Sequence, residues 1–123
     1  MTPDEMREDY HCRSAFVDYG LKCEPVEGYR GDVAFTLDDV ADVVFCEDTG
    51  ESYGSDLHAV VQLSDGRWAY LNNSCCSCGF SSRGVAWVTD DYGRLIQFGV
   101  VDTIRERLPE NLDALMASRE VSP

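Results

Sequence analysis

The segment 57–73 carries the pattern that most constrains the fold. Two runs of largely alternating apolar and polar residues, 57–63 and 68–73, flank the turn-forming pair Asp65-Gly66, and this arrangement predicts a β-hairpin. If Asp65-Gly66 forms a two-residue turn, Leu63 faces Trp68 across the hairpin. One face then carries these apolar side chains and is expected to cover the core: Leu57, Ala59, Val61, Leu63, Trp68 and Tyr70.

The opposite face of this hairpin carries polar residues, among them His58. In the same register His58 pairs with Asn73, and Cys75 becomes its diagonal neighbour, roughly 7–8 Å away at the backbone. A four-residue turn would shift the register and separate the two side chains. Joint ligation of an ion by His58 and Cys75 therefore depends on the length of the turn.

A second hairpin is predicted from residues 85–89 and 94–98, which are joined by the turn 90–93. The stretch 22–32 contains proline and glycine residues and is expected to be a loop. The core is thus predicted to be a three- or four-stranded antiparallel sheet.

Helical patterns precede and follow the hairpins. Residues 2–5 read as a capping box ahead of a helix that should run to about Tyr19. The segment 36–44 has helical spacing, although its β-branched run 40–45 leaves a strand open as the alternative. From Val100 the pattern becomes helical again.

The chain has 123 residues, of which 44% are hydrophobic, and this is enough for one hydrophobic core. We therefore predict a single α+β domain over residues 1–123, in which helices flank a small antiparallel sheet of two hairpins. The sequence shows neither a signal-peptide pattern nor an apolar run long enough for a membrane span. We expect a protein of the cytoplasm with no membrane partner, whose six cysteines are reduced or bind metal.

The net charge of −13 argues against direct binding to nucleic acids, because affinity for phosphates comes from lysine and arginine. One interpretation is that the acidic residues keep the surface soluble. The other is that they attract a basic protein or imitate DNA. The clustered residues Asp38, Asp39 and Asp42 are the candidates for such an acidic surface.

The densest chemical feature is the run Cys75-Cys76-Ser77-Cys78. Cys75 and Cys78 have the spacing at which a tight turn directs two sulfur atoms to one zinc ion. The remaining ligands would have to come from Cys46, His58 or Cys76. The alternative is a set of free or partly buried thiols, because a lone CxxC is a weak metal signal.

An enzymatic site could be drawn from Cys75 or Cys78 with His58 as the activating base. No third orienting group or nucleophile turn accompanies them, so we expect no enzyme activity. Trp68 and Trp87 are expected in the core, and Phe80 is expected to be the exposed aromatic residue.

The segment Leu63-Ser64-Asp65-Gly66-Arg67-Trp68-Ala69-Tyr70, followed by Cys75 and Gly79-Phe80, resembles a segment of small uncharacterised accessory proteins of actinobacterial phages. The preceding residues 37–43 are similar to the helix that comes before the hairpin in those proteins. This chain has Phe80 where tryptophan is usual and Ser82 in place of a second cysteine. The resemblance implies a phage gene product in the bacterial cytoplasm and implies no activity.

The expected function is therefore a small non-enzymatic interaction protein that binds a host protein, which would present a basic surface if the acidic charge selects it. Binding would use the 75–84 loop, with Phe80 and Arg83, or the acidic face of Asp38, Asp39 and Asp42. A thiol-centred enzyme and a DNA-mimicking inhibitor of a host DNA-binding protein are the alternatives.

Overall fold

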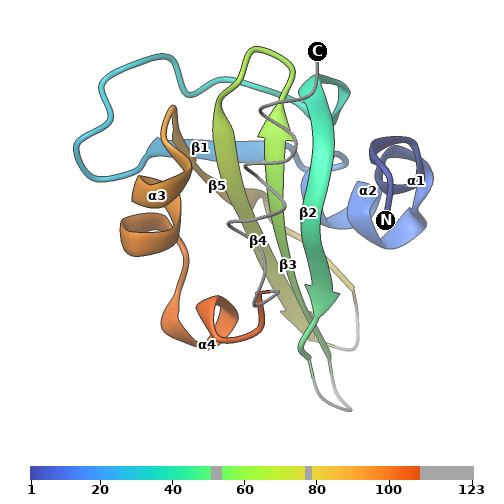
Figure 1. Ribbon diagram of the computed structural model, residues 1–123. Coiled ribbons are helices and arrows are strands. Elements are labelled where there is room, and N and C mark those ends of the chain that lie inside the picture. Colours follow the sequence, from blue (N-terminus) through green and yellow to red (C-terminus); the bar gives the residue numbers. More distant parts are fainter. Residues whose placement is uncertain (51–53, 77–78, 109–123) are drawn as a thin grey trace.

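The computed structural model describes residues 1–50, 54–76 and 79–108. Within these residues, five strands form one mixed sheet in the order β1-β5-β4-β3-β2 (Figure 1). The strand β1 runs parallel to β5, and the other neighbours are antiparallel. Their bounds are Leu21–Pro25 (β1), Val40–Asp48 (β2), Gly54–Leu63 (β3), Trp68–Cys76 (β4) and Gly84–Thr89 (β5).

The hairpin of β3 and β4 closes around three residues instead of the expected two. The Leu63 N–H donates to the Arg67 carbonyl, and the Gly66 N–H donates to the Leu63 carbonyl. Gly66 has a φ of 94°, which a three-residue hairpin loop requires and glycine adopts without a Cβ clash. The extra loop residue shifts the register by one, so that Val60 pairs with Tyr70.

This shift moves two of the six residues of the predicted core face, Trp68 and Tyr70, to the other side of the sheet. The first face carries Leu57, Ala59, Val61 and Leu63, joined by Ala69 and Leu71. The second face carries Val60, Trp68 and Tyr70. Both faces are buried, so the prediction of one apolar face with Trp68 and Tyr70 on the same side as Leu57 is wrong.

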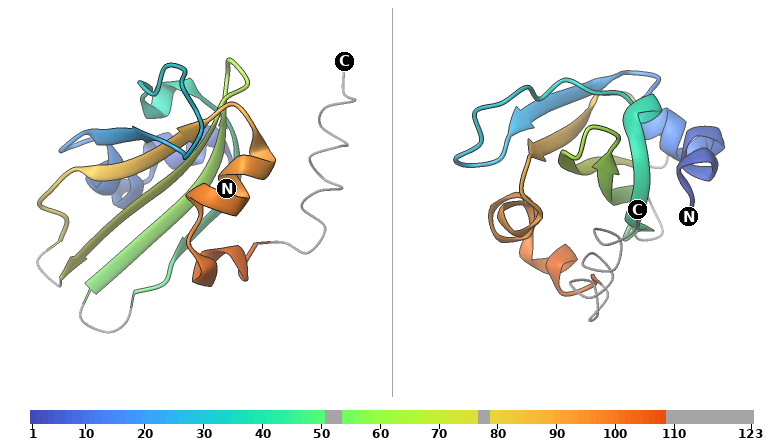
Figure 2. Two further views of the ribbon diagram at one scale, coloured as in Figure 1. Left: turned by 90° about the vertical axis from the view of Figure 1, so that its left-hand side faces the viewer. Right: turned by 45° about the horizontal axis from the view of Figure 1, so that its top comes forward.

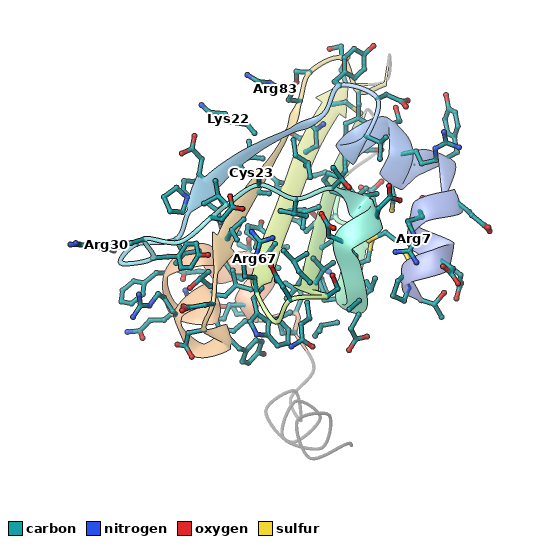
Figure 3. All side chains as sticks on the ribbon, turned by 90° about the horizontal axis from the view of Figure 1, so that it is seen from above. Arg7, Lys22, Cys23, Arg30, Arg67 and Arg83 are labelled. Carbon is teal, nitrogen blue, oxygen red and sulfur yellow. The ribbon has the colours of Figure 1, made fainter. Side chains whose placement is uncertain are left out.

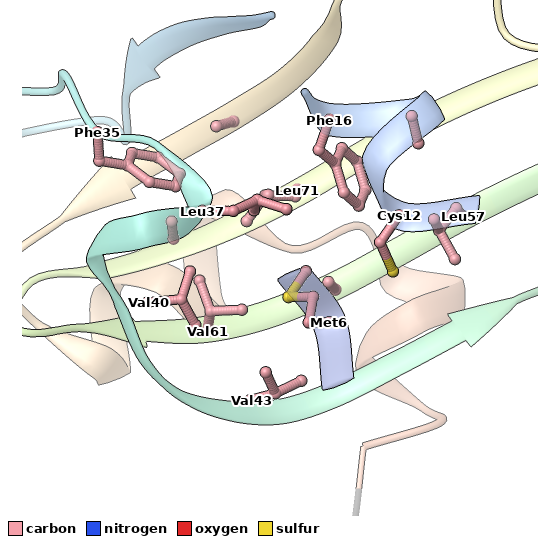
Figure 4. Packing of buried hydrophobic residues seen from close by; sticks show 14 of the residues in the cluster. Met6, Cys12, Phe16, Phe35, Leu37, Val40, Val43, Leu57, Val61 and Leu71 are labelled. Carbon is pink, nitrogen blue, oxygen red and sulfur yellow. The ribbon is translucent and has the colours of Figure 1, made fainter. Parts of the chain in front are cut away.

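Short helices cover the first face. The helix α1 (Pro3–Glu8) begins with the predicted capping box at Thr2, and α2 (Tyr10–Phe16) follows after a break at Asp9. Asp9 caps α2 by accepting a hydrogen bond from the Cys12 N–H, which explains why the expected continuous helix is divided. Figure 4 shows Met6, Cys12 and Phe16 packed onto the sheet.

The second face is covered by the segment after β5, which contains α3 (Tyr92–Arg94), the π-helix η2 (Leu95–Gly99) and α4 (Asp102–Arg105). Leu95, Val100 and Ile104 pack there against Trp68 and Tyr70. Figure 2 shows this segment and the α1–α2 pair on opposite sides of the sheet.

The prediction of an antiparallel sheet of two hairpins is therefore wrong. Residues 94–98 are helical because Asp91 caps the segment, its carboxylate accepting the Arg94 N–H. The expected loop 22–32 contains most of β1, and 40–48 is a strand preceded by the one-turn helix η1 (Leu37–Asp39). In the described part of the chain, strands outweigh helices and the sheet has five strands.

Candidate functional site

A cleft of about 360 Å³ lies between α2 and the ends of β3 and β4. The helix contributes Tyr10, His11 and Ser14 to its wall. The strands and the chain after them contribute both polar and apolar groups, including Ser55, Cys75 and Phe80. A mixed lining of this kind suits recognition of a side chain that has both polar and apolar parts.

His11 connects the helical wall of the cleft to the sheet. Its Nε2 lies 3.0 Å from Oδ2 of Asp48 at the end of β2, and its ring packs 5.1 Å from the ring of Phe80. Burial opposes ionisation of Asp48, but hydrogen bonds from the backbone N–H groups of Asp56 and Gly50 outweigh it and lower the pKa of Asp48 to about 2. Asp48 is therefore a stable carboxylate that orients the imidazole.

Tyr10 is the most exposed large side chain on this wall, with 84% of its surface accessible. It also borders a second hollow of about 260 Å³, which is lined by Glu8, Arg13 and Asp18. Val17, which is 45% exposed, lies on the same side of the helical segment because seven residues complete about two helical turns. Tyr19, shortly after the helix, is also exposed, and we call these three exposed residues the α2 surface: Tyr10, Val17 and Tyr19.

The aromatic residues differ from the sequence-based expectation. Phe80 is only 7% exposed and packs into the first-face core, so its predicted exposure is wrong. Trp68 is buried as predicted, whereas Trp87 is 38% exposed and is not a core residue. Trp87 pairs with Tyr70 across β4 and β5 and so lies on the same side of the sheet as Trp68. Its exposure depends on which segments cover that part of the sheet, and no local sequence pattern shows this.

The cations do not gather at the cleft. Figure 3 shows Lys22, Arg30 and Arg83 extending outward from the β1 side of the molecule. Arg67 instead points inward, where its guanidinium donates to the carbonyls of Asp32 and Ala34. These hydrogen bonds connect the loop that contains Asp32 and Ala34 to the turn of the β3–β4 hairpin. Arg83 is exposed as expected of a binding residue, but Phe80 beside it is buried.

The predicted metal ligands are distributed over both sides of the sheet. Cys75 packs against the first-face core, whereas His58 contacts Tyr70 on the second face, so the register that made them diagonal neighbours is wrong. Cys46 shares a hydrogen bond with Cys12, and Cys78 lies outside the described residues. Across 1–50, 54–76 and 79–108, no cluster of histidine, cysteine and acidic side chains has a metal-binding arrangement.

His58 belongs to a closed polar network inside the molecule. Its Nδ1 lies 2.6 Å from the Tyr70 hydroxyl and its Nε2 lies 3.0 Å from Oδ2 of Asp56. The Asn72 amide donates to the other oxygen of Asp56 at 2.9 Å. Burial, together with the charge of Asp56, raises the pKa of Tyr70. These mutual hydrogen bonds satisfy the buried groups, and the network acts as a structural connection between β3 and β4.

The three candidate acids do not form one exposed cluster. Asp39 is half-buried and caps η1, because its Oδ2 accepts the Thr36 N–H at 3.0 Å. Asp42 is half-buried on β2, and Asp38 is the one of the three that is exposed. Their sequence proximity therefore does not give a continuous acidic surface.

Sequence reasoning assigned no role to His11 and missed Tyr10 and Asp48. Their positions are far apart in sequence, and only the packing of α2 over the end of β2 brings His11 and Asp48 together. A comparison with protein families, curated proteins and solved structures finds no match for the chain. In the described part of the chain, no helix has both the length and the apolar character that a membrane span needs.

Proposed function

We propose that this chain is a small, acidic, phage-encoded interaction protein that binds a host protein through the α2 surface and acts without enzyme activity. The exposure of Tyr10 between two hollows is the observation that carries the proposal. A tyrosine with a cleft on each side can bury a large apolar area while its hydroxyl remains hydrogen-bonded, and such residues often dominate protein interfaces.

Charge supports a basic partner. The chain has a net charge of −13, and the hollow beside Tyr10 is lined by two acids, Glu8 and Asp18, and by one cation, Arg13. The exposed cations Lys22, Arg30 and Arg83 extend from the β1 side. A basic surface would therefore be attracted to the protein over long distances.

The test is a quantitative pull-down from bacterial lysate with the full chain and two variants. Tyr10→Ser should reduce capture of a specific basic protein roughly tenfold or more. Phe98→Ser removes an aromatic residue that is 54% exposed on η2, on the other side of the sheet, and should leave capture unchanged. Association should also slow as salt rises from about 0.1 M to 1 M. Equal capture by the Tyr10 variant would exclude the α2 surface.

A thiol-centred enzyme remains a second candidate, because Cys75 and His11 line one cleft and Asp48 orients His11. In this arrangement the imidazole would take the thiol proton and the carboxylate would stabilise the resulting imidazolium. It replaces the predicted pairing with His58, which lies on the second face.

The two candidates differ in the reactivity of Cys75. If His11 activates the thiol, alkylation of Cys75 by iodoacetamide at neutral pH should slow roughly tenfold in His11→Ala. Peptide mass spectrometry with wild-type protein as reference measures this rate. If Cys75 is alkylated at the rate of an ordinary cysteine in both proteins, the enzyme candidate is excluded and only the interaction function is left.

A further inference from the structure

The thiols of Cys12 and Cys46 come from separate elements and meet in the first-face core. Cys46 is on the same face of β2 as Asp48, two residues away, and Cys12 follows His11 on α2. Cys12 lies on α2 and is 1% exposed, and Cys46 lies on β2, half-buried against the same first-face core. The contact between His11 and Asp48, at 3.0 Å, independently places the start of α2 over the end of β2. Figure 4 shows Cys12 beneath α2, next to Leu57 of the sheet.

The two thiols are not equivalent. The hydrogen bond from Cys12 lowers the pKa of Cys46 despite its partial burial. The same hydrogen bond, together with burial, raises the pKa of Cys12. Cys46 is therefore the thiol that ionises first, and it is also the more accessible one. A partly exposed thiol whose pKa is lowered, beside a second thiol, is the arrangement of cysteines that respond to oxidants.

We propose that Cys12 and Cys46 form a reversible disulfide in response to peroxide, and that this bond attaches α2 to β2. The Cys46 thiolate attacks one oxygen of hydrogen peroxide; the O–O bond breaks, giving a sulfenic acid and, after proton uptake, water. The Cys12 sulfur then attacks the Cys46 sulfur, so that the S–S bond forms and the S–O bond breaks. The Cys12 proton leaves with the departing hydroxide as a second water, and the two thiols supply the two electrons that reduce the peroxide.

Tryptic mapping tests this pairing on the intact chain without ambiguity. Cleavage after arginine and lysine gives the peptide 8–13, in which Cys12 is the only cysteine, and the peptide 31–67, in which Cys46 is the only cysteine. Treatment of reduced protein with hydrogen peroxide should join these two peptides and lower the intact mass by two hydrogen atoms. Dithiothreitol should reverse both changes.

Variants separate the two steps of the reaction. Cys12→Ser should stop at the Cys46 sulfenic acid, which the reagent dimedone traps as a stable adduct in the peptide 31–67. Cys23→Ser should still form the cross-link, because Cys23 lies on β1, at the opposite edge of the sheet from β2 and Cys46. Cross-linking of 31–67 to a different cysteine peptide, or oxidation of wild-type Cys46 to sulfinic acid without a cross-link, would overturn the proposal.

A second readout does not depend on any variant. A disulfide between α2 and β2 closes a long loop and restricts the unfolded chain, so oxidised wild-type protein should melt about 5 °C or more above reduced protein. An unchanged or lower melting temperature in protein whose mass confirms the disulfide would show that the bond does not fasten α2 to the sheet in its present position.

Discussion

His58 illustrates how a residue that looks functional in the sequence can serve the fold. It is 6% exposed, and its ring lies between Tyr70 and Asp56 within the sheet. Tyr70→Phe removes the 2.6 Å contact with His58 and should lower the free energy of unfolding by about 1–2 kcal/mol. Urea denaturation measures this loss. Tyr10→Phe, at an exposed position, is the matched control, and equal stability of the two variants would refute the structural role of the network.

Asp48 connects stability to acidic pH. Its pKa falls from an ordinary 3.8 to about 2 in the folded chain, so the folded state binds fewer protons than the unfolded state between these values. The contribution of ionised Asp48 to the stability of the folded state is complete above about pH 4 and is lost as pH falls towards about 2. Unfolding followed from pH 6 to pH 2 should show a weaker pH dependence in Asp48→Asn. The charge-matched variant Asp38→Asn should keep the wild-type slope; a loss of slope in both would indicate a general charge effect.

At the scale of elements, local patterns predict where the chain turns more reliably than how its strands align. The hairpin at 57–73 was predictable from its alternation and from Asp65-Gly66. Its register was not, because two- and three-residue loops both suit this turn and differ by one residue. Residues 94–98 were predicted to be a strand, and this was wrong because Asp91 caps the segment, which is helical.

The three-residue loop makes a specific demand on Gly66. Its φ of 94° is unfavourable for a residue with a Cβ atom, although nothing within 4 Å would contact that atom. Gly66→Ala should therefore destabilise the protein by about 1 kcal/mol through backbone strain alone. Gly93→Ala, within α3 and without a positive φ, should change the midpoint of urea unfolding little. If Gly66→Ala were neutral as well, the loop would not require the left-handed conformation.

At the scale of the whole molecule, the unpredictable features are those made by distant segments. The parallel pairing of β1 with β5 joins residues 21–25 to 84–88, and no local pattern encodes such a partner. The cleft has the same origin, since His11 comes from the first helical pair and Cys75 from the end of β4. A sequence reading can identify such residues as chemically capable, but only the packing of the elements decides which of them meet.

The sheet separates two cores, and whether they unfold together tests the prediction of a single domain. Val60 and Val61 are neighbours on β3, are fully buried and belong to opposite faces. Replacing either with alanine should lower the free energy of unfolding by roughly 1.5–3 kcal/mol. Because both cores share the same strands, each variant should still unfold in one transition.

The measurement uses a Trp87→Phe background, in which Trp68 on the second face is the only one of the two tryptophans left. Its fluorescence reports the second face, and far-ultraviolet circular dichroism reports the whole sheet. Coincident urea transitions in Val60→Ala and in Val61→Ala would show that the shared strands couple the two cores. A fluorescence change that precedes the loss of circular dichroism in Val60→Ala would mean that the second-face helices detach first, and the chain would then not behave as a single cooperative unit.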